Sequence, residues 1–378
     1  MSRRRRASRW SALGVRLDLL RELGPRLAWE LRRLNSSYAQ ASSSPASLYE
    51  EAMWREAAVK VGAEQRRLSP TIIEVRRGEA TTHIAHRATT ALTDRATFEL
   101  SSDKPTSLQL LRAAGVPIPE HIVLESRDLA AAEAFMRSQG APLIVKPAVG
   151  QGGSGVIGHV TTPAQLARAL RHAARFDRRV LIERHMQGDS YRLLFLDGEL
   201  LDTIRRPAPQ LTGDGSSTIE ELITREYERR IAAGGDGAGW KPYDIDLDCL
   251  TVVESSGYRL DSVLDNGTSI PIRTATNHTG PDLTETFRGT MSRDLVAASL
   301  AAVSVLGPRL AGVDVVTTDP ERALEETGGV ILEVNALPGL LHHYQVADQA
   351  NATRVAVPIL EALLGRPAPG LPYRPADR

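Results

Sequence analysis

Several features that would assign a chain to a well-defined class are scarce or missing here. Cys249 is the only cysteine among 378 residues, so no disulfide can form within the chain and a reducing compartment, the cytoplasm, is expected. No apolar run reaches the roughly 18 residues of a membrane-spanning helix. Basic and acidic residues number 46 each, which argues against a globally basic nucleic-acid binder, and we expect no nucleic-acid partner.

Lysine and aromatic residues are also rare. Aromatic residues make up 4 % of the chain, so Leu, Val, Ile and Ala must supply most of the core. Four lysines stand against 42 arginines. Because arginine is the default cation in this chain, each position that holds lysine is informative. The four are Lys60, Lys104, Lys146 and Lys241.

The two ends of the chain differ from its middle. Residues 1–34 hold ten Arg and three acidic residues, a charge of +7, with leucines at helical spacing. Two interpretations stay open: a helix that contacts a membrane surface or a protein, and a solvated basic tail or docking helix, which is the commoner fate of basic runs. Residues 35–47 are rich in Ser and predict a linker, and residues 365–378 predict a proline-rich tail.

Capping residues, turn signals and periodicity predict the elements between residues 48 and 364. Asp103 and Thr162 stand just before helix-initiating prolines, as N-caps do. Asp197-Gly198 separates two apolar runs, as in a β-hairpin. The predicted helices are 48–62, 105–114, 128–138, 163–174, 218–231, 295–306 and 351–364. The predicted strands are 71–75, 81–85, 143–146, 156–160, 180–183, 191–196, 199–204, 312–317 and 330–337.

A glycine-rich loop follows a strand lysine. Lys146-Pro147 leads into Gly-Gln-Gly-Gly-Ser-Gly at 150–155, whose backbone N–H groups could hold phosphate. A strand follows the loop, unlike a Rossmann loop, and the Gly-Lys-Ser/Thr ending of a Walker loop is missing. In protein kinases the glycine loop precedes the lysine. What remains is a lysine that contacts phosphate and a flexible hairpin lid, or simply a glycine-rich turn.

Three oxygen-bearing side chains fall on two apolar strands that a charged loop joins. Glu333 and Asn335 share one face of a strand because they are two residues apart. Asp314 lies on the other strand. Carboxylate and amide oxygens suit Mg²⁺ together with nucleotide phosphates. The alternative is that this face is solvated and the acids are merely exposed.

Four further residues are singled out by position alone. Arg206 ends a predicted strand before a proline, and Arg273 follows the apolar run Ile-Pro-Ile. Glu183 ends a strand and Asp189 follows shortly after it. The end of a strand that becomes a linker suits backbone contacts to a purine and a carboxylate contact to ribose.

Seven segments, in order, resemble the ATP-grasp superfamily, and in particular the ATP-grasp part of cyanophycin synthetases and related carboxylate–amine ligases. They lie between residues 101 and 364. The resemblance implies an α+β fold in which two α+β lobes, 101–182 with the lid and 183–364 with a metal site, clamp ATP beside a reduced N-terminal lobe at 48–100. The segments are DKPTSLQLLRAAGVPIP (103–119), IVKPAVGQGGSGV (144–156), LIERHMQGDSYRLLFLDGEL (181–200), RRPAPQLTGDGSSTIEELI (205–223), PIRTATNHTG (271–280), GVDVVTT (312–318) and ILEVNALPGL (331–340).

The resemblance also implies which residues bind the nucleotide. Lys104 and Lys146 match the lysines that hold the phosphates, so half of the lysines in this chain fall on those two positions. Glu183 matches the adenine hinge and Asp189 the ribose position. The lid residues implied in ATP binding are Gly152, Gly153, Ser154 and Gly155.

A second set is implied in metal binding and catalysis. Asp314, Glu333 and Asn335 match the ligands of two Mg²⁺ ions, with Glu333 bridging them, and Mn²⁺ is an alternative metal. Arg206 and Arg273 match the arginines that hold the transferred phosphoryl group and the acyl phosphate.

The implied activity is ATP-dependent ligation of a small-molecule carboxylate to an amine, on amino acids or short peptides, through an acyl phosphate. A kinase or carboxylase on the same scaffold and a non-catalytic nucleotide-binding scaffold are the alternatives. Because the region before residue 101 is short, we expect the first substrate to be held by an unusual element or by a partner subunit. We also expect a homo-oligomer.

Overall fold

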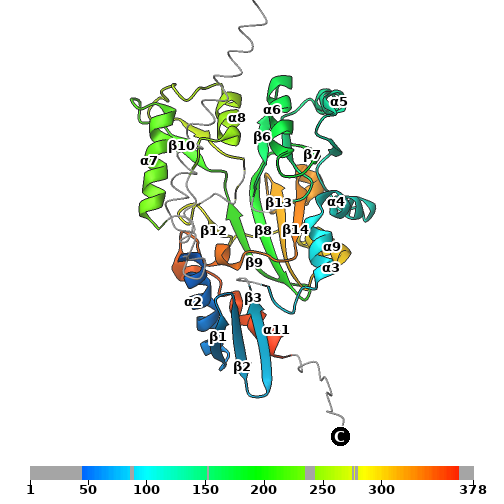
Figure 1. Cartoon of the computed structure of the whole chain (residues 1–378), viewed down its shortest axis with the longest axis vertical. Coiled ribbons are helices and arrows are strands. Elements are labelled where there is room, and N and C mark those ends of the chain that lie inside the picture. Colours follow the sequence, from blue (N-terminus) through cyan, green and yellow to red (C-terminus); the bar gives the residue numbers. More distant parts are fainter. Residues whose placement is uncertain are drawn as a thin grey trace, which may run out of the picture.

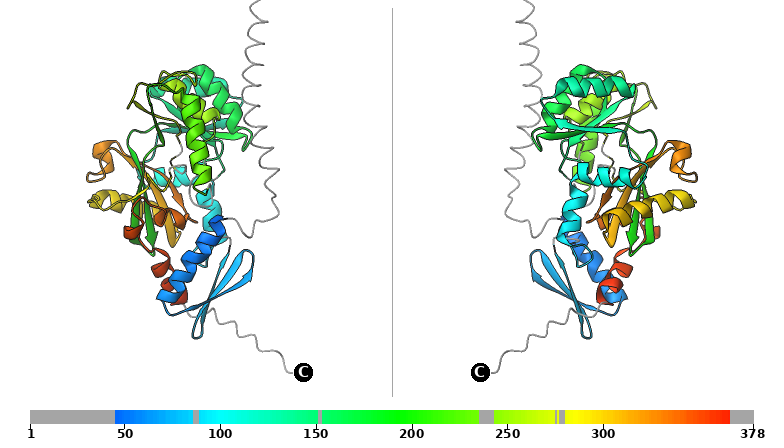
Figure 2. Two further views of the ribbon diagram at one scale, coloured as in Figure 1. Left: turned by 90° about the vertical axis from the view of Figure 1, so that its left-hand side faces the viewer. Right: turned by 90° about the vertical axis from the view of Figure 1, so that its right-hand side faces the viewer.

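The structure is a computed structural model, shown in Figure 1. A small N-terminal lobe lies at one end, a central lobe lies at the other, and a five-stranded sheet lies between them (Figures 1 and 2). In the described part of the chain no helix is long and apolar enough to cross a membrane. The predicted basic segment and, apart from Gly365, the predicted tail fall outside the described residues. The structure describes residues 45–85, 89–150, 153–234, 243–274, 276 and 280–365.

The N-terminal lobe is a three-stranded antiparallel sheet covered by two helices, one from each end of the described chain. Trp54 and Ile84 are almost fully buried in it and share one apolar core with Leu194 and Leu310 of the five-stranded sheet. The lobe is therefore packed into the body of the protein. Its elements are α2 (Pro45–Lys60), β1 (Glu64–Ser69), β2 (Ile72–Arg77), β3 (Ala80–Ala85) and α11 (Ala356–Leu364).

The hairpin predicted at 71–75 and 81–85 is confirmed as β2 and β3, but one strand here was missed and the predicted starts of two helices need correction. Strand β1 was not expected, because Leu68 is its only large apolar residue. Helix α2 begins at Pro45, so residues 45–47 of the predicted linker are helical, while residues 35–44 lie outside the described residues. Helix α11 begins at Ala356 and not at residue 351, because a short 3₁₀ turn and a Thr353 side chain that donates to Asp202 occupy the preceding residues.

The central lobe is a four-stranded antiparallel sheet of order β4-β7-β5-β6, with α5 and α6 packed against it. The glycine-rich loop at 150–155 joins two neighbouring antiparallel strands, so the predicted hairpin is confirmed. Thr162 and Gln165 form a reciprocal capping box at the start of α6, as predicted for Thr162. The elements are β4 (His121–Glu125), α5 (Leu129–Gln139), β5 (Leu143–Pro147), β6 (Ile157–Val160), α6 (Pro163–Ala173) and β7 (Arg179–Arg184).

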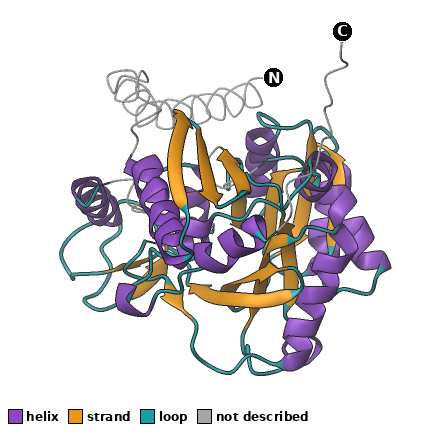
Figure 3. Ribbon diagram, turned by 90° about the horizontal axis from the view of Figure 1, so that it is seen from below, coloured by secondary structure: helices purple, strands orange, loops and turns teal. Residues whose placement is uncertain are grey.

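The five-stranded sheet is antiparallel, with the order β12-β9-β8-β13-β14. Its register places Arg192 and Glu333 on either side of Asp314, so their side chains share one face. Helices flank the strands (Figure 3). Leu111 of α4 and Leu295 of α9 pack with buried residues of β8, β13 and β14 in one apolar core. The elements are α3 (Arg95–Ser102), α4 (Lys104–Ala113), β8 (Asp189–Leu196), β9 (Glu199–Arg206), β12 (Glu285–Thr286), α9 (Arg293–Leu306), β13 (Leu310–Thr317), α10 (Leu324–Thr327) and β14 (Val330–Asn335).

The segment between β9 and β12 is an insertion with its own apolar core, which includes Ile223, Tyr243 and Val253. Only its helix α7 was predicted. Its strands are three residues long, and the apolar run Leu-Asp-Cys-Leu-Thr-Val-Val, which forms α8, lacks the clear period of an amphipathic helix. The elements are β10 (Gln210–Thr212), α7 (Ile219–Ala232), α8 (Leu247–Ser255) and β11 (Ser269–Pro271).

Candidate active site

A cavity of about 420 Å³ lies where the central lobe meets the five-stranded sheet. Predicted residues from segments far apart in the sequence line it together. Gly155 and Asp189 are not among its lining residues, and Gly152 lies outside the described residues. The predicted residues that line the cavity are Lys104, Lys146, Gly153, Ser154, Glu183, Arg206, Arg273, Asp314, Glu333 and Asn335.

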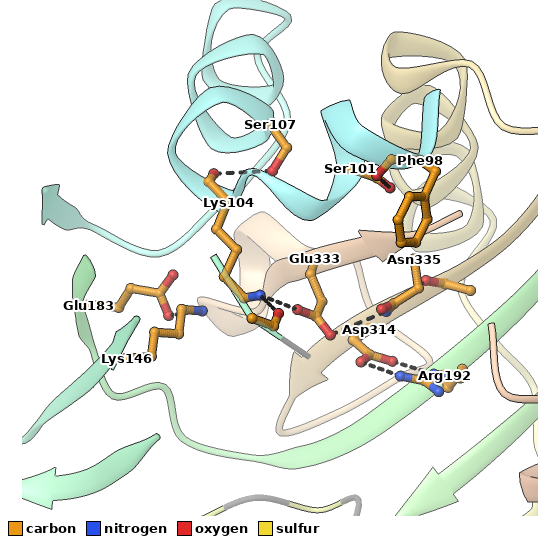
Figure 4. A network of polar contacts seen from close by, with 12 residues as sticks. Phe98, Ser101, Lys104, Ser107, Lys146, Glu183, Arg192, Asp314, Glu333 and Asn335 are labelled. Carbon is orange, nitrogen blue, oxygen red and sulfur yellow. Dashed lines mark hydrogen bonds and ion pairs between the residues drawn. The ribbon is translucent and has the colours of Figure 1, made fainter. Parts of the chain in front are cut away.

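Lys146 and Glu183 form a buried ion pair between β5 and β7. The distance from Lys146 Nζ to Glu183 Oε2 is 2.7 Å, and Glu183 is 1 % exposed (Figure 4). The second oxygen, Oε1, is buried and has no hydrogen-bond partner in the described part of the chain. A buried acceptor without a donor costs free energy. The carboxylate is therefore suited to receive a hydrogen bond from a ligand in the cavity.

Lys104 reaches the cavity from the first turn of α4, which Asp103 caps as predicted. Its Nζ donates to Gly150 O at 2.6 Å and lies 3.9 Å from Glu333 Oε2. Burial lowers the pKa of Lys104, and the charge on Glu333 opposes this effect. The lysine thus bridges the glycine-rich loop of one lobe and a carboxylate of the other (Figure 4).

Asp314 is held by two arginines. Arg192 donates from Nε and Nη2 to its two carboxylate oxygens, each at 2.7 Å, and Arg206 donates from Nη2 at 2.9 Å. Burial alone would raise the pKa of Asp314, but the two guanidinium groups outweigh burial and hold this pKa below its usual range. Arg192 was missed in the sequence. The alternation of side chains along β8 shows only which face of the strand Arg192 occupies. Its partner, Asp314, is set by the register of β8 with β13.

Glu333 and Asn335 come from one face of β14, as their spacing predicts. Asn335 Nδ2 donates to Glu333 Oε1 at 3.2 Å, and Glu333 keeps about a third of its side chain exposed. In the described residues no group of three or more His, Cys, Asp or Glu side chains forms a closed metal site. The donor set is hard oxygen, which fits Mg²⁺ if phosphate oxygens and water complete its shell.

Arg273 enters the cavity from the end of the insertion. It donates to Asp244 O at 2.9 Å and to Asp246 Oδ2 at 2.6 Å. Burial lowers its pKa, but Asp246 and Asp248 outweigh burial and raise the pKa above its usual range. The Nε–H groups of Arg206 and Arg273 are both buried without a hydrogen-bond partner among the described residues. The wall therefore carries donors suited to an anion.

The chain matches known ligases in sequence and in fold. The sequence model of the family described as the D-alanine–D-alanine ligase C-terminus matches residues 110–204. Cyanophycin synthetase of Geminocystis herdmanii is 32 % identical over 268 residues, which are 70 % of this chain and 30 % of that protein. D-alanine–D-alanine ligase of Chromohalobacter salexigens is 33 % identical over 162 residues, 39 % of this chain and 51 % of that one. The bifunctional glutathione synthetase of Pasteurella multocida superposes with a TM-score of 0.52 at 18 % identity, covering 82 % of this chain and 43 % of that one.

The sequence of this chain is similar to ATP-grasp ligases over part of their length. The chain has the α+β ATP-grasp fold, as predicted, and its central lobe and five-stranded sheet enclose the cavity. It spans about a third of the length of the cyanophycin synthetases that it matches. Their activities are therefore carried over to this ATP-grasp chain only as a proposal.

Asp189, the predicted ribose ligand of this ATP-grasp chain, lies beside the cavity. Arg205 Nε donates to its Oδ2 at 2.8 Å, and the same guanidinium donates to Glu285 at 3.1 Å. Gly188, its neighbour, does line the cavity. The role of Asp189 stays a prediction that would require its carboxylate to accept from a ligand as well as from Arg205.

Two histidines that the sequence did not single out line the ATP-grasp cavity beside the hinge after β7. The rings of His159 and His185 meet edge to face, with centroids 4.2 Å apart. Burial lowers the pKa of both histidines, that of His185 to about 4, so both rings are neutral at pH 7. Ile144, Met186 and Leu332 also line the cavity, so its lining includes uncharged side chains besides the two neutral rings.

Proposed function

We propose that this chain is an ATP- and Mg²⁺-dependent carboxylate–amine ligase that forms an amide through an acyl phosphate, on amino acids or short peptides. The observation that carries the proposal is one cavity lined by Lys104, Lys146, Asp314, Glu333 and Asn335. Cations for phosphate and oxygen ligands for a metal would have no reason to converge in a merely structural cleft.

The base and phosphates of ATP match different parts of the wall. The uncharged lining that includes the neutral rings of His159 and His185 suits a purine ring. The free Oε1 of Glu183 is an acceptor and therefore favours the exocyclic amino group of adenine over the carbonyl oxygen of guanine. Lys104 and Lys146, beside the glycine-rich loop, would hold phosphates as point charges. We expect ATP to support turnover and GTP to fail at equal concentration.

The metal would be held by Glu333 and Asn335 and by the lone pair of Asp314 that the arginines leave. Bound there, Mg²⁺ would neutralise charge that develops on the phosphoryl oxygens. Two ions with Glu333 as the bridge, or Mn²⁺ in their place, are part of the proposal. Arg206 and Arg273 would offer their free N–H groups to the transferred phosphoryl group.

The proposed reaction consists of two steps, a phosphoryl transfer to the carboxylate and an acyl transfer to the amine. A carboxylate oxygen attacks the γ-phosphorus of ATP, the bond to the β–γ bridging oxygen breaks, and ADP leaves. The amine nitrogen then attacks the carbonyl carbon of the acyl phosphate and loses a proton, and phosphate leaves with the C–O bond electrons. Residues 153–155 and the rest of the lid would exclude water, which would otherwise hydrolyse the acyl phosphate.

The test is ADP release measured over pooled amino acids and short peptides, followed by mass analysis of the product. A mass equal to acid plus amine minus water supports a ligase. ADP with a phosphorylated or carboxylated product would identify a kinase or a carboxylase, and no ADP with any pool would identify a scaffold. Glu333→Gln should abolish ADP release and leave the unfolding temperature unchanged, and near-normal turnover of this variant would refute the metal assignment.

Location and assembly are also part of the proposal. With a single buried cysteine, the chain suits the cytoplasm. We propose a homo-oligomer, which sedimentation at several concentrations would test. Contact of residues 1–34 with a membrane surface or a protein is the proposed role of the basic segment, and removal of those residues would test it.

A further inference from the structure

Strand β6 carries a bulge that faces the cavity. Its register with β5 pairs Val160 with Leu143 and Ile157 with Val145, so Gly158 and His159 lie opposite a single residue. His159 has a φ of +52°, a left-handed conformation that is strained for a residue with a side chain. Bulges commonly re-aim side chains beside functional sites. This one places His159 in the cavity wall against His185.

The bulge also frees a backbone donor, and Asp248 of α8 accepts it. Gly158 N donates to Asp248 Oδ1 at 3.0 Å. The same carboxylate accepts twice from Thr274, from Oγ1 at 2.8 Å and from the backbone N at 2.9 Å. Asp248 is 3 % exposed, so none of the three hydrogen bonds competes with bulk water. A Cβ at Gly158 would overlap the Thr274 side chain, so glycine permits this approach.

Arg273 immediately precedes Thr274 and is held from the same stretch of chain. Asp244 O and Asp246 Oδ2 accept from its guanidinium group, and Asp246 also caps α8. Residues 244–248 thus hold the arginine at one end and the β6 bulge at the other. Both Arg273 and Thr274 line the cavity. Of these acids, only Asp248 bonds to β6.

We propose that Asp248 is a positioning residue that ties the Arg273–Thr274 segment to β6, so that the strand beside the nucleotide base sets the place of the arginine at the phosphate. This role rests on the proposed function, because it matters only if one nucleotide contacts both β6 and Arg273. A misplacement of about 1 Å in such a group can lower turnover on the order of 100-fold.

The first test follows hydrogen exchange by mass spectrometry with and without AMP-PNP and Mg²⁺. In the wild type, the nucleotide should slow exchange in peptides that cover β5–β6 and in those that cover 272–274. Asp248→Asn weakens the tie, because in either orientation its amide NH₂ faces one of the two backbone N–H donors, that of Gly158 or that of Thr274. In this variant β5–β6 should stay protected, while protection of 272–274 should fall at least threefold. Thr251→Val, which removes a buried hydroxyl within α8, is the control and should behave like the wild type.

The outcomes separate the two proposals. If the nucleotide protects β5–β6 in the wild type and 272–274 remains equally protected in Asp248→Asn, the positioning role is wrong and the proposed function stands. If the nucleotide protects neither segment in the wild type, the proposed function fails, and this role fails with it.

The second test is a double-mutant cycle on ADP release. Asp248→Asn should lower kcat 10- to 100-fold with the KM for ATP within threefold. In an Arg273→Ala background the same change should cost less than twofold, because the residue that it positions is gone. Equal losses in both backgrounds would show a merely structural role and overturn the proposal. Should Asp248→Asn unfold, Thr274→Val, which removes one of the three bonds, takes its place in the cycle with the same expectation.

Discussion

Lys146 and Glu183 are each other's only charge partner within 4 Å among the described residues, and Glu183 is almost completely enclosed. A buried pair of this kind destabilises strongly when one member is removed, because the other charge stays buried without compensation. With the phosphate-binding role that we propose for Lys146, the pair would link the stability of the central sheet to the binding of the nucleotide.

We expect Lys146→Met to lower the free energy of unfolding by about 3–5 kcal/mol and to abolish ATP binding. Urea unfolding and titration calorimetry with ATP and Mg²⁺ measure the two effects. Lys60→Met is the matched control, since Lys60 pairs with Glu56 on the surface of α2 and its loss should cost at most about 1 kcal/mol. The expectation is wrong if the two variants lose equal stability and both bind ATP.

Arg192→Lys should lower kcat/KM for ADP release 10- to 100-fold. Lysine cannot reproduce the two-pronged contact with Asp314, so Arg206 would be drawn toward the carboxylate and away from the phosphoryl group. Arg309 makes the same two-pronged contact with Asp197 at a partly exposed hairpin turn. Arg309→Lys should leave the kinetics unchanged, and similar losses in both variants would contradict the role given to Arg192.

The sequence predicts the parts of the site that depend on local pattern. Lys146 and the glycine loop are contiguous, and Glu333 and Asn335 share a face through the period of a strand, so both groups could be placed in advance. Arg192 and Asp314 are 122 residues apart, and only the register of β8 with β13 brings them together. Asp248 escaped notice for the same reason, because it lies in an apolar run and its partner Gly158 is 90 residues away.

The secondary structure shows the same difference between elements with a local sequence signal and elements that depend on tertiary contacts. The hairpin strands around Asp197-Gly198, and the helices capped by Asp103, Asp128, Thr162 and Thr218, begin and end close to the predicted residues. The insertion between β9 and β12 was largely missed, because β10 and β11 are too short to show a period and derive their stability from packing against α7 and α8. Tertiary contacts, which local propensity does not encode, decide such elements.

Stability should fall as the pH drops from 6.5 to 4 in a manner that depends on His185. Burial, and then the neighbouring His159, lower the pKa of His185 to about 4, whereas an unfolded chain has a histidine pKa near 6.5. Between these values the unfolded chain binds a proton that the folded protein does not, so acid favours unfolding. Between pH 7.5 and pH 5 this amounts to a loss on the order of 2 kcal/mol.

Urea unfolding at the two pH values tests this expectation. His185→Gln should flatten the loss by that amount, while His83→Gln, at an exposed position of β3, should retain the wild-type slope. A wild-type slope in His185→Gln would mean that other groups carry the pH dependence.

Trp54→Ala tests whether the N-terminal lobe folds as part of the whole. Trp54 is 1 % exposed and lies in a core that continues into Leu194 and Leu310 of the five-stranded sheet. Removing the indole leaves a cavity, so we expect a loss of about 3–5 kcal/mol in the free energy of unfolding. Val59→Ala, on the same helix but 74 % exposed, should change stability by less than about 0.5 kcal/mol. Because the core is continuous, far-UV circular dichroism and tryptophan fluorescence should report one coincident transition in Val59→Ala and in the wild type. An early separate transition of the lobe would show that β1–β3 are stabilised by themselves and not by the sheet that carries Arg192.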